Sequence, residues 1–400
     1  MRKKQVIISA TLSTLGLSML TSIHAHASFV EDSKASLQLR NFYLNSDYRQ
    51  AGATQSKREE WAQGFILKYE SGYTDGPVGF GLDALGLLGL KLDSGPERQN
   101  TGLLPVGSDK APDDYSQMGL TGKIRISKTH LKFGTLIPKL ATVAPSDSRL
   151  LPQAFQGTHL TVREIDGLTI NAGRLTQNSL RNSSSSDDMT VAGSGVSGGQ
   201  ATDQFDFAGA RYDWTKRLTT EYNYGHLKQN YKQHIVNALH TLPIGANRSV
   251  VSDLRYAHSS DDGNSNVDNK ALGAMFTYKL NSHKFAAAYQ KMNGATGFPH
   301  INGTTSFLVN YVMLSPDFAN PDEKSWQVRY DYDFAGLGIP GLSFMTRYLR
   351  GDNFERGGSD AKEWERNTDI AYAIQNGPFK NVGLRWRNGS YRREAAAGTI

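Results

Sequence analysis

The ten residues from Ser325 to Phe334 read SWQVRYDYDF, a run in which polar or charged residues alternate with apolar or aromatic ones. Side chains of an extended strand point to opposite faces in turn, so Trp326 and Val328 share one face while Arg329 and Asp331 share the other. A face that carries arginine and aspartate must meet water, whereas the opposite face must meet lipid or a protein core. The stretch therefore predicts a β-strand that separates an aqueous side from an apolar side.

The same alternation recurs along the chain, and no convincing long helical pattern interrupts it. It is clear in residues 60–73, 123–126 and 382–387, where aromatic or aliphatic residues face one way and glycines or charged residues face the other. In a soluble sandwich the apolar faces would pack on each other and the strands would often be shorter. Segments of about ten residues with aromatics near their ends are typical of transmembrane barrels. The predicted fold class is therefore an all-β, transmembrane antiparallel β-barrel.

The connections between the predicted strands alternate between short and long. Short connections carry turn residues, as in residues 73–77 (YTDGP) and 375–378 (QNGP). The long connections cover residues 45–59, 91–118, 138–156, 176–201, 259–268, 292–324 and 351–362. Only the link near residues 226–229 is short where a long one is expected. Periplasmic turns and extracellular loops alternate in this way in outer-membrane barrels, so residues 28–400 are predicted to form a single channel domain.

The number of strands predicts an incomplete barrel. About 17 strands fit into the chain, whereas single-chain bacterial barrels have even numbers of strands. We therefore expect 18 strands in the complete barrel and a chain that stops just before the last one, roughly 20 residues short of the full product. Without that strand, two sheet edges would face lipid, which is costly because their backbone groups would lack partners.

Composition narrows the class of protein. The 400 residues carry a formal charge of +6, no cysteine and a mean hydropathy of −0.48. These values exclude a multi-span helical membrane protein, a disulfide scaffold and cysteine-based zinc or thiol chemistry. Three basic residues at 2–4, an apolar run from Val6 to Leu20 and the sequence Ala25-His26-Ala27 predict a signal peptide over residues 1–27, cleaved after Ala27. Loss of the three basic residues lowers the formal charge from +6 to +3.

Several motifs resemble the OprD family of substrate-specific outer-membrane porins. The resemblance covers nearly the whole mature chain and rests on residues 36–43, 61–65, 89–93, 123–128, 148–153, 323–331, 341–348 and 384–388. It implies an eighteen-stranded barrel in the bacterial outer membrane, a pore narrowed by loops folded into the lumen, and a ladder of basic residues that guides carboxylate-bearing solutes. The missing end of the chain is the one departure from the family pattern.

Basic residues in the water-facing phase of the strands are the candidate translocation ladder. A selective channel needs charge that lowers the entry barrier for its solute without trapping it, and arginine can hold a carboxylate bidentately and pass it on. Strand phase selects Arg40, Lys123, Arg125, Arg163, Arg329, Arg347, Arg385 and Arg387. Resemblance to the family most strongly favours Arg125, Arg329, Arg347, Arg385 and Arg387. We expect at least three of the eight residues to form a continuous track. The alternative for each arginine is pairing with a wall carboxylate, as for Arg329 and Asp331, which share a face.

Two of the long loops are candidates for the constriction. Residues 138–156 and 292–324 contain apolar runs, which are unexpected in an extracellular loop unless the loop folds inward. The candidate constriction residues in these loops are Arg149, Tyr311 and Asp317. An extra membrane strand over 307–314 is the alternative, but it would place a polar link of about ten residues on the short-turn side. Resemblance implies that Asp317 is an acidic group facing the ladder, and a loop-capping aspartate is the alternative.

Other chemistry is not indicated by the sequence. Residues 195–199 (GVSGG) match the nucleophile pattern of hydrolases, but they lie in a Ser/Gly-rich loop rather than between a strand and a helix. The histidines show no metal-ligand pair at helical spacing. No catalytic residue, metal, cofactor or nucleic-acid partner is therefore predicted.

The sequence thus predicts a passive, substrate-selective outer-membrane channel for small carboxylate-bearing solutes. The solute is left open among an aromatic acid, a dicarboxylate and a basic amino acid. Expected partners are outer-membrane lipid and lipopolysaccharide as well as the solutes, and a weak homotrimer is left open as the assembly. The alternatives are an oligosaccharide channel of the same family, an outer-membrane hydrolase, and a barrel that serves only as a scaffold.

Overall fold

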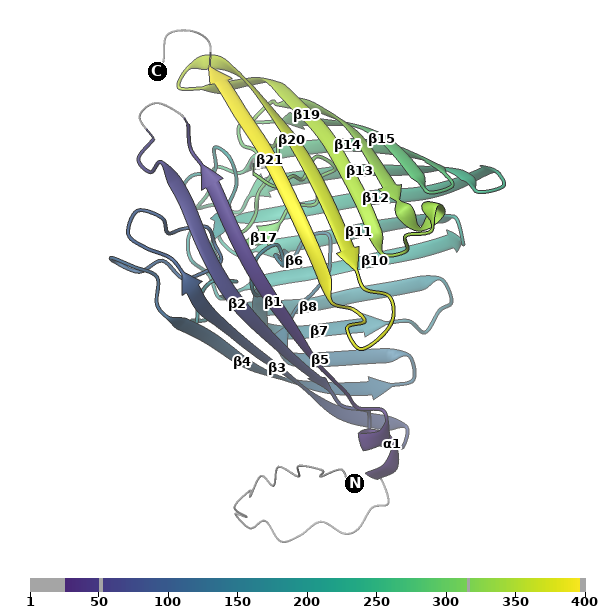
Figure 1. The fold of residues 1–400 in the computed structure, drawn as a ribbon. Helices are drawn as coiled ribbons and strands as arrows, with labels where there is room; N and C mark the ends of the chain where they lie inside the picture. Colours follow the sequence, from purple (N-terminus) through teal and green to yellow (C-terminus); the bar gives the residue numbers. More distant parts are fainter. Residues whose placement is uncertain (1–25, 50–52, 315–316, 396–400) are drawn as a thin grey trace.

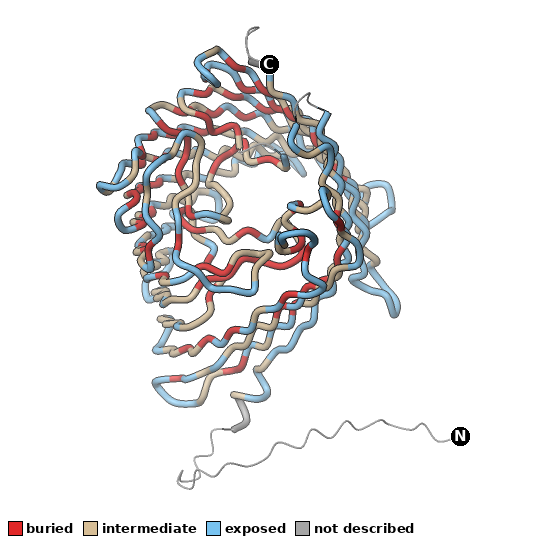
Figure 2. Tube along the Cα trace, turned by 90° about the vertical axis from the view of Figure 1, so that its left-hand side faces the viewer, coloured by how far each residue is buried: buried red, intermediate tan, exposed pale blue. Residues whose placement is uncertain are grey.

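The computed structural model of the protein describes residues 26–49, 53–314 and 317–395. Its main feature is one antiparallel sheet of 17 strands that curls into a ring (Figures 1 and 2). A short helix, α1 (His26–Glu31), precedes it, and no helix in these residues is long and apolar enough to span a membrane. The predicted signal peptide lies outside the described residues except for its last two positions. The strands of the sheet are β1 (Lys34–Asp47), β2 (Lys57–Glu70), β3 (Val78–Asp93), β4 (Asp114–Ile126), β5 (Thr129–Leu136), β7 (Ala154–Val162), β8 (Leu168–Ser179), β10 (Phe205–Thr215), β11 (Leu218–Leu227), β12 (Tyr231–Gly245), β13 (Arg248–Asp261), β14 (Asp268–Leu280), β15 (His283–Asn293), β18 (Lys324–Asp333), β19 (Leu342–Arg356), β20 (Ser359–Ala373) and β21 (Gly383–Ala395).

Each strand of the sheet pairs with the next strand of the sheet along the chain. The β1–β2 ladder, for example, runs without a break from Lys34 opposite Glu70 to Asp47 opposite Lys57. Within the described residues, β1 and β21 are the two edges of the sheet, because each has a hydrogen-bonded neighbour on one side only. The predicted fold class is confirmed, and the expected count of about 17 strands agrees with the described sheet.

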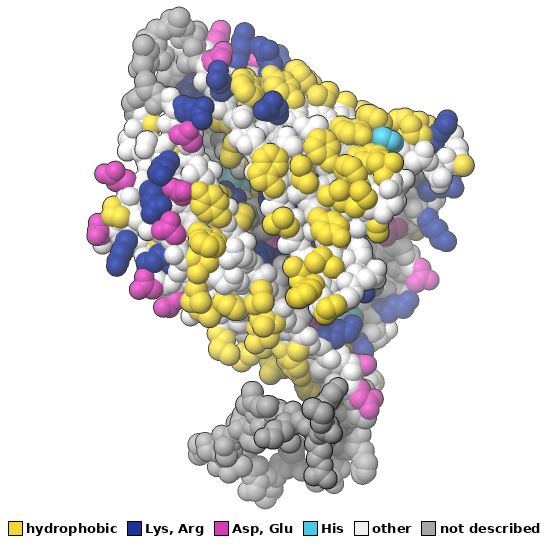
Figure 3. Space-filling model, in the orientation of Figure 1, with side chains coloured by type: hydrophobic (Ala, Val, Ile, Leu, Met, Phe, Trp, Pro, Cys, Tyr) yellow, Lys and Arg dark blue, Asp and Glu magenta, His cyan; other side chains and the backbone are white. Residues whose placement is uncertain are grey.

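The two faces of the sheet differ in polarity as the alternation predicts. On β18, Trp326 is 42% exposed on the outside of the ring, whereas its neighbour Gln327 is 2% exposed on the inside. On β21, Leu384 and Trp386 are likewise exposed on the outside. Figure 3 shows the apolar side chains covering the outer face of the strands. An apolar outside and a polar inside fit a wall between lipid and water.

The two ends of the ring carry different connections. At one end the strands are joined by tight turns, such as those at Asn247 (φ 55°) and Asn281 (φ 50°), where asparagine tolerates the left-handed backbone conformation. The opposite end, called the loop end below, carries the long connections. The link between β11 and β12 covers only residues 228–230 at that end, so the expected exception is confirmed.

Three long loops fold into the ring and pair with one another. They are the β5–β7 loop (137–153), the β8–β10 loop (180–204) and the β15–β18 loop (294–323). The strand pair β6 (Ala144–Pro145) with β17 (Thr304–Thr305) joins the first to the third, and β9 (Val191–Ala192) with β16 (His300–Ile301) joins the second to the third. Figure 2 shows buried segments crossing the inside of the ring. The predicted folding of loops into the lumen is confirmed.

The apolar run at 307–314 belongs to this inner layer and forms no strand. Leu308 packs in one cluster with the wall residues Ile235, Ala257 and Ala271, which point inward from β12, β13 and β14. Burial of these side chains fixes the loop against the wall because apolar surface is removed from water. The alternative of an extra membrane strand here is therefore wrong.

Candidate functional site

The last two strands place two arginines against a single carboxylate. Arg385 and Arg387 lie on β21 in the lumen-facing phase, and Asp369 lies on β20, directly opposite Arg387. Arg385 donates through Nε to both carboxylate oxygens of Asp369 at 2.9 Å, and Arg387 donates through Nε to one of them at 3.0 Å. Asp369 is buried, whereas both guanidinium groups remain partly exposed. Two positive charges thus share one negative charge on this part of the wall.

Arg329 on β18 and Arg347 on β19 are cross-strand neighbours with different partners. Arg329 forms an ion pair of 2.6 Å with Asp331, which is the pairing that the sequence left open. Arg347 donates through Nε to the side-chain oxygen of Asn367 at 2.7 Å and through Nη1 to the backbone carbonyl of Tyr311 at 2.9 Å. These hydrogen bonds position Arg347 with neutral acceptors and tie the wall to the β15–β18 loop.

Two further arginines reach the same region from the loops. In the β5–β7 loop, Arg149 donates through Nε to the backbone carbonyl of Thr101 at 3.0 Å. In the β8–β10 loop, Arg181 donates to the hydroxyl of Ser146 at 2.7 Å. Burial and the nearby charges of Arg181 and Arg387 lower the pKa of Arg149 to about 10, and burial likewise lowers the pKa of Arg181. Several cations are therefore held close enough to repel one another, as expected where an anion is to be attracted.

Tyr311 and Asp317 in the β15–β18 loop lie beside these arginines. Burial raises the pKa of the Tyr311 hydroxyl, and the charge of Asp317 adds to the increase while Arg181, Arg149 and Arg347 oppose it. Asp317 accepts a hydrogen bond of 2.6 Å from the hydroxyl of Ser306 within its own loop. Burial raises the pKa of Asp317 to about 7 in spite of this bond. Asp317 thus accepts a hydrogen bond within its own loop and also interacts with the charge of Arg347. Both roles predicted from the sequence, a loop-capping aspartate and an acidic group facing the ladder, therefore stay open.

Lys123 and Arg125 on β4 form a second basic group around Tyr73. The ammonium group of Lys123 is buried, 2.5 Å from a carboxylate oxygen of Asp83 and 4.9 Å from the centre of the Tyr73 ring. The guanidinium of Arg125 lies 4.6 Å from the same ring centre. The group lies towards the tight-turn end, since β4 ends at Ile126.

Arg163 lies apart from both groups, whereas Arg40 donates through Nη1 to the backbone carbonyl of Arg149 at 3.2 Å. Arg40 on β1 forms a two-pronged ion pair with Asp147 of the β5–β7 loop, over 2.5 Å and 3.0 Å. It therefore holds a constriction loop against the wall. Arg163 is exposed just beyond the end of β7, in a tight turn. The ladder role of all eight predicted residues stays a prediction.

Arg181 is the candidate site residue that sequence reasoning missed. It lies in a Ser-rich loop that was not considered for the constriction, although it is the only charged residue between Arg174 and Asp187. A Cβ atom on Gly102 would lie 3.2 Å from its Nη2 atom and 3.8 Å from Nε of Arg149, so the two guanidinium groups flank the same backbone. The only basic residue of the β8–β10 loop was the available signal.

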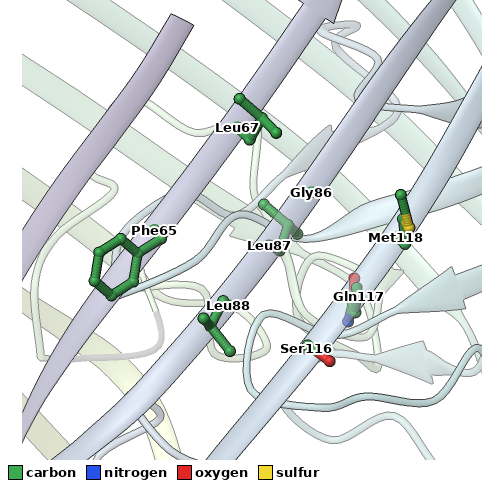
Figure 4. Close-up of a pocket in the computed structure, with 8 residues that line it drawn as sticks. All are labelled: Phe65, Leu67, Gly86, Leu87, Leu88, Ser116, Gln117 and Met118. Carbon is green, nitrogen blue, oxygen red and sulfur yellow. The ribbon is translucent and has the colours of Figure 1, made fainter. Parts of the chain in front are cut away.

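The apolar depression shown in Figure 4 is not part of the solute path. Its volume is about 350 Å³, and its lining includes Phe65, Leu67, Leu88 and Met118 from β2, β3 and β4. These side chains lie on the outer face, where Met118 is 87% exposed. The depression therefore belongs to the lipid-facing surface. Among the described residues, no group of three histidine or acidic side chains is placed to hold a metal ion.

A curled antiparallel sheet with an apolar outside, arginines on its inside and loops folded into its lumen defines an outer-membrane β-barrel channel. Comparison with known proteins gives the family. The sequence profile of the outer membrane porins of the OprD family matches residues 27–399, so the chain belongs to that family. Proteins of this family are porins of the outer membrane.

The similar proteins cover nearly the whole chain. The porin-like protein GalP of Pseudomonas putida is 39% identical over 371 residues, which are 92% of this chain and 88% of GalP. The crystal structure of Pseudomonas aeruginosa OpdQ matches with a TM-score of 0.85 and 55% identity over 92% of this chain and 95% of that one. The crystal structure of Pseudomonas aeruginosa OpdK with vanillate matches with a TM-score of 0.84 and 39% identity, over 91% and 95% of the two chains.

Proposed function

We propose that this porin is a passive channel for small solutes that carry a carboxylate group. The observation that carries the proposal is the pair Arg385 and Arg387, which shares the one carboxylate of Asp369 and keeps guanidinium surface exposed to the lumen. A solute carboxylate can replace part of that shared interaction because guanidinium groups bind carboxylates through two parallel hydrogen bonds. The similar channel OpdK, whose structure contains the aromatic carboxylate vanillate, supports this solute class.

The path that we propose runs from the loop cations to the wall arginines. Arg149 and Arg181 would attract the carboxylate at the constriction, and Arg387 and Arg385 would receive it further along the wall. Each step exchanges one guanidinium partner for the next, so no single site holds the solute tightly. Arg329 and Arg40 each have a carboxylate of their own, Asp331 and Asp147, so in this proposal they support the wall and the loop and do not carry the solute.

Ion selectivity in planar bilayers tests the proposal. We expect the double variant Arg385→Gln with Arg387→Gln to lose most of the anion preference measured as a reversal potential across a salt gradient. The matched control is Arg174→Gln with Lys232→Gln, which removes the same charge from the outer face of β8 and β12. An unchanged reversal potential in the first variant would overturn the proposal.

Liposome uptake tests the solute class separately. We expect faster uptake of benzoate-type acids than of uncharged sugars of similar size, and equal rates would contradict a carboxylate channel. We propose in addition that residues 1–27 are removed on export. Mass spectrometry of the protein from outer membranes should then find Ser28 as the first residue.

A further inference from the structure

The outer face of β18–β21 carries a cluster of arginines that the solute path does not use. Arg350 on β19, Arg366 on β20 and Arg392 on β21 are exposed and alternate along their strands with lumen-facing residues. Strand register places Trp326, Arg350, Trp364 and Arg392 in one row across four neighbouring strands. Figure 3 shows dark blue side chains gathered at the upper, loop end of the molecule, above the apolar surface of these strands. Arg350, Arg366 and Arg392 are called the arginine patch below.

The arginine patch has aromatic neighbours instead of acidic partners. Within the described residues, none of its three guanidinium groups forms an ion pair, whereas the lumen-facing Arg329, Arg385 and Arg387 do. The guanidinium of Arg392 lies 5.9 Å from the centre of the Trp364 ring. Tyr348 lies between the two tryptophans, and its ring centre is 5.6 Å from that of Trp326 and 6.0 Å from that of Trp364. Three cations without ion-pair partners favour the binding of an anion, although exposed Asp352 and Glu394 follow two residues further along β19 and β21.

The position of the patch on the barrel defines an amphiphilic partner. Towards the tight-turn end, the same outer face continues with Val328, Ile370, Leu384 and Trp386, all of which are exposed. An anion at the patch would therefore carry its apolar part along this surface, as a membrane lipid does. The patch lies towards the loop end, which faces the cell exterior in outer-membrane barrels. The lipid of that leaflet in bacterial outer membranes is lipopolysaccharide.

The spacing of the patch fits a head group with two phosphates. Arg350 and Arg392 lie on β19 and β21, on either side of Trp364, and neighbouring strands are about 4.8 Å apart, so their backbones are separated by ~10 Å. A single phosphodiester would need one arginine, whereas a two-sugar unit with a phosphate at each end reaches both. Trp364 lies between them with Tyr348 stacked beside it, and the part of its ring that stays exposed offers an apolar surface on which a sugar ring can pack. Guanidinium groups bind phosphate oxygens bidentately.

We propose that the arginine patch, with Trp364 at its centre, binds the phosphorylated disaccharide head group of lipopolysaccharide. This inference concerns the outer face and is independent of the solute that crosses the lumen. It gives the barrel a fixed lipid neighbour along β18–β21, which are the strands that carry the wall arginines on their inner face.

The test measures binding of lipid to the purified protein in detergent, with three probes. These are lipopolysaccharide, lipopolysaccharide stripped of its phosphates, and phosphatidylglycerol. We expect intact lipopolysaccharide to bind at least tenfold more tightly than either of the others, and to raise the temperature of unfolding. In the variant Arg350→Gln, Arg366→Gln and Arg392→Gln, we expect tenfold weaker binding of lipopolysaccharide and loss of that thermal shift.

Two further variants separate the effect of the arginine patch from the effect of positive charge alone. The charge-matched control is Lys216→Gln, Arg217→Gln and Arg248→Gln, which removes three exposed basic groups from the tight-turn end and should leave binding unchanged. Replacement of the patch by three lysines keeps its charge and solubility but removes the bidentate geometry, and should weaken binding several-fold. Equal affinity for the three probes, or for the glutamine variant and the wild type, would overturn the proposal.

Discussion

The guanidinium of Arg347, on the barrel wall, donates a hydrogen bond of 2.9 Å to the backbone carbonyl of Tyr311, in the loop that narrows the lumen. The same side chain donates to Asn367 on the neighbouring strand at 2.7 Å. Arg347 therefore connects the wall to the constriction. Its two possible contributions, the positive charge and the hydrogen bond to Tyr311, can be separated by mutation. A lysine keeps the charge but lacks the forked donor that reaches both acceptors.

We predict that Arg347→Lys increases single-channel conductance while it leaves most of the anion selectivity in place. Loss of a hydrogen bond from a charged donor costs about 2 kcal/mol, which loosens the hold on the β15–β18 loop. Arg347→Gln removes the charge as well, so selectivity should fall too. Bilayer recordings of conductance and reversal potential distinguish the two variants. Equal selectivity of both variants would show that the charge of Arg347 does not act on the permeating ion.

The pKa of Asp317 predicts that ion selectivity depends on pH near neutrality. A carboxyl with a pKa of about 7 is protonated in about nine molecules of ten at pH 6 and in about one of ten at pH 8. The negative charge thus appears as the pH rises, so anion preference should be higher at pH 6 than at pH 8. Asp317→Asn keeps a neutral group at every pH and should remove the difference. Reversal potentials at the two pH values test this, and a pH response that persists in Asp317→Asn would assign it to another group.

A buried acidic pair near the loop end predicts a second dependence on pH, this time of stability. Burial and the charge of Glu363 raise the pKa of Glu323 to about 9. Between the ordinary pKa near 4.5 and this value, the unfolded chain releases the proton while the folded protein keeps it. Stability is therefore lost as the pH rises through that range. We predict that Glu323→Gln, which needs no proton, is more stable than wild type by about 2 kcal/mol at pH 8, with a smaller difference at pH 5.

The contrasting variant is Glu363→Gln on β20. Glu363 accepts hydrogen bonds of 2.6 Å from Arg393 and 2.5 Å from Tyr391, so its loss leaves the half-buried Arg393 charge without its counter-charge. We expect a loss of about 3 kcal/mol at both pH values. Heat-induced unfolding, followed as a shift in gel mobility, measures both variants. A stabilising effect of Glu363→Gln would contradict the assignment of Glu363 as the charged member of the pair and Glu323 as the protonated one.

The faces of the strands could be predicted from the sequence because alternation is a local property. Trp326 and Arg329 follow from the period of two alone, and so does the pairing of Arg329 with Asp331, which lies two residues away on the same face. The inward folding of the β15–β18 loop was also predictable, since an apolar run in an extracellular loop needs a surface to cover it.

The partners across strands and loops could not be predicted in this way. Arg385 and Arg387 meet Asp369 because the register of β20 and β21 aligns them, and register depends on turn length and packing rather than on either strand alone. Arg181 reaches Ser146 from another loop, over a separation that no spacing in the sequence encodes. The position of Arg163 in a tight turn likewise depends on where β7 ends.

The last prediction concerns Gln153, whose amide ties the β5–β7 loop to the β15–β18 loop and to the wall strand β8. Its Nε2 atom donates to Asn178 at 2.8 Å and to the backbone carbonyl of Asn302 at 3.1 Å, and its oxygen accepts from the backbone of Ser146 at 3.0 Å. Gln153→Ala leaves these buried groups without partners, which costs about 1–3 kcal/mol. We expect noisier, larger single-channel currents and faster proteolysis of the loops in proteoliposomes. Gln156→Ala, which removes one bond between wall strands, is the matched control and should leave the currents unchanged. Identical currents in the two variants would mean that the loops are held by their apolar contacts and not by the Gln153 amide.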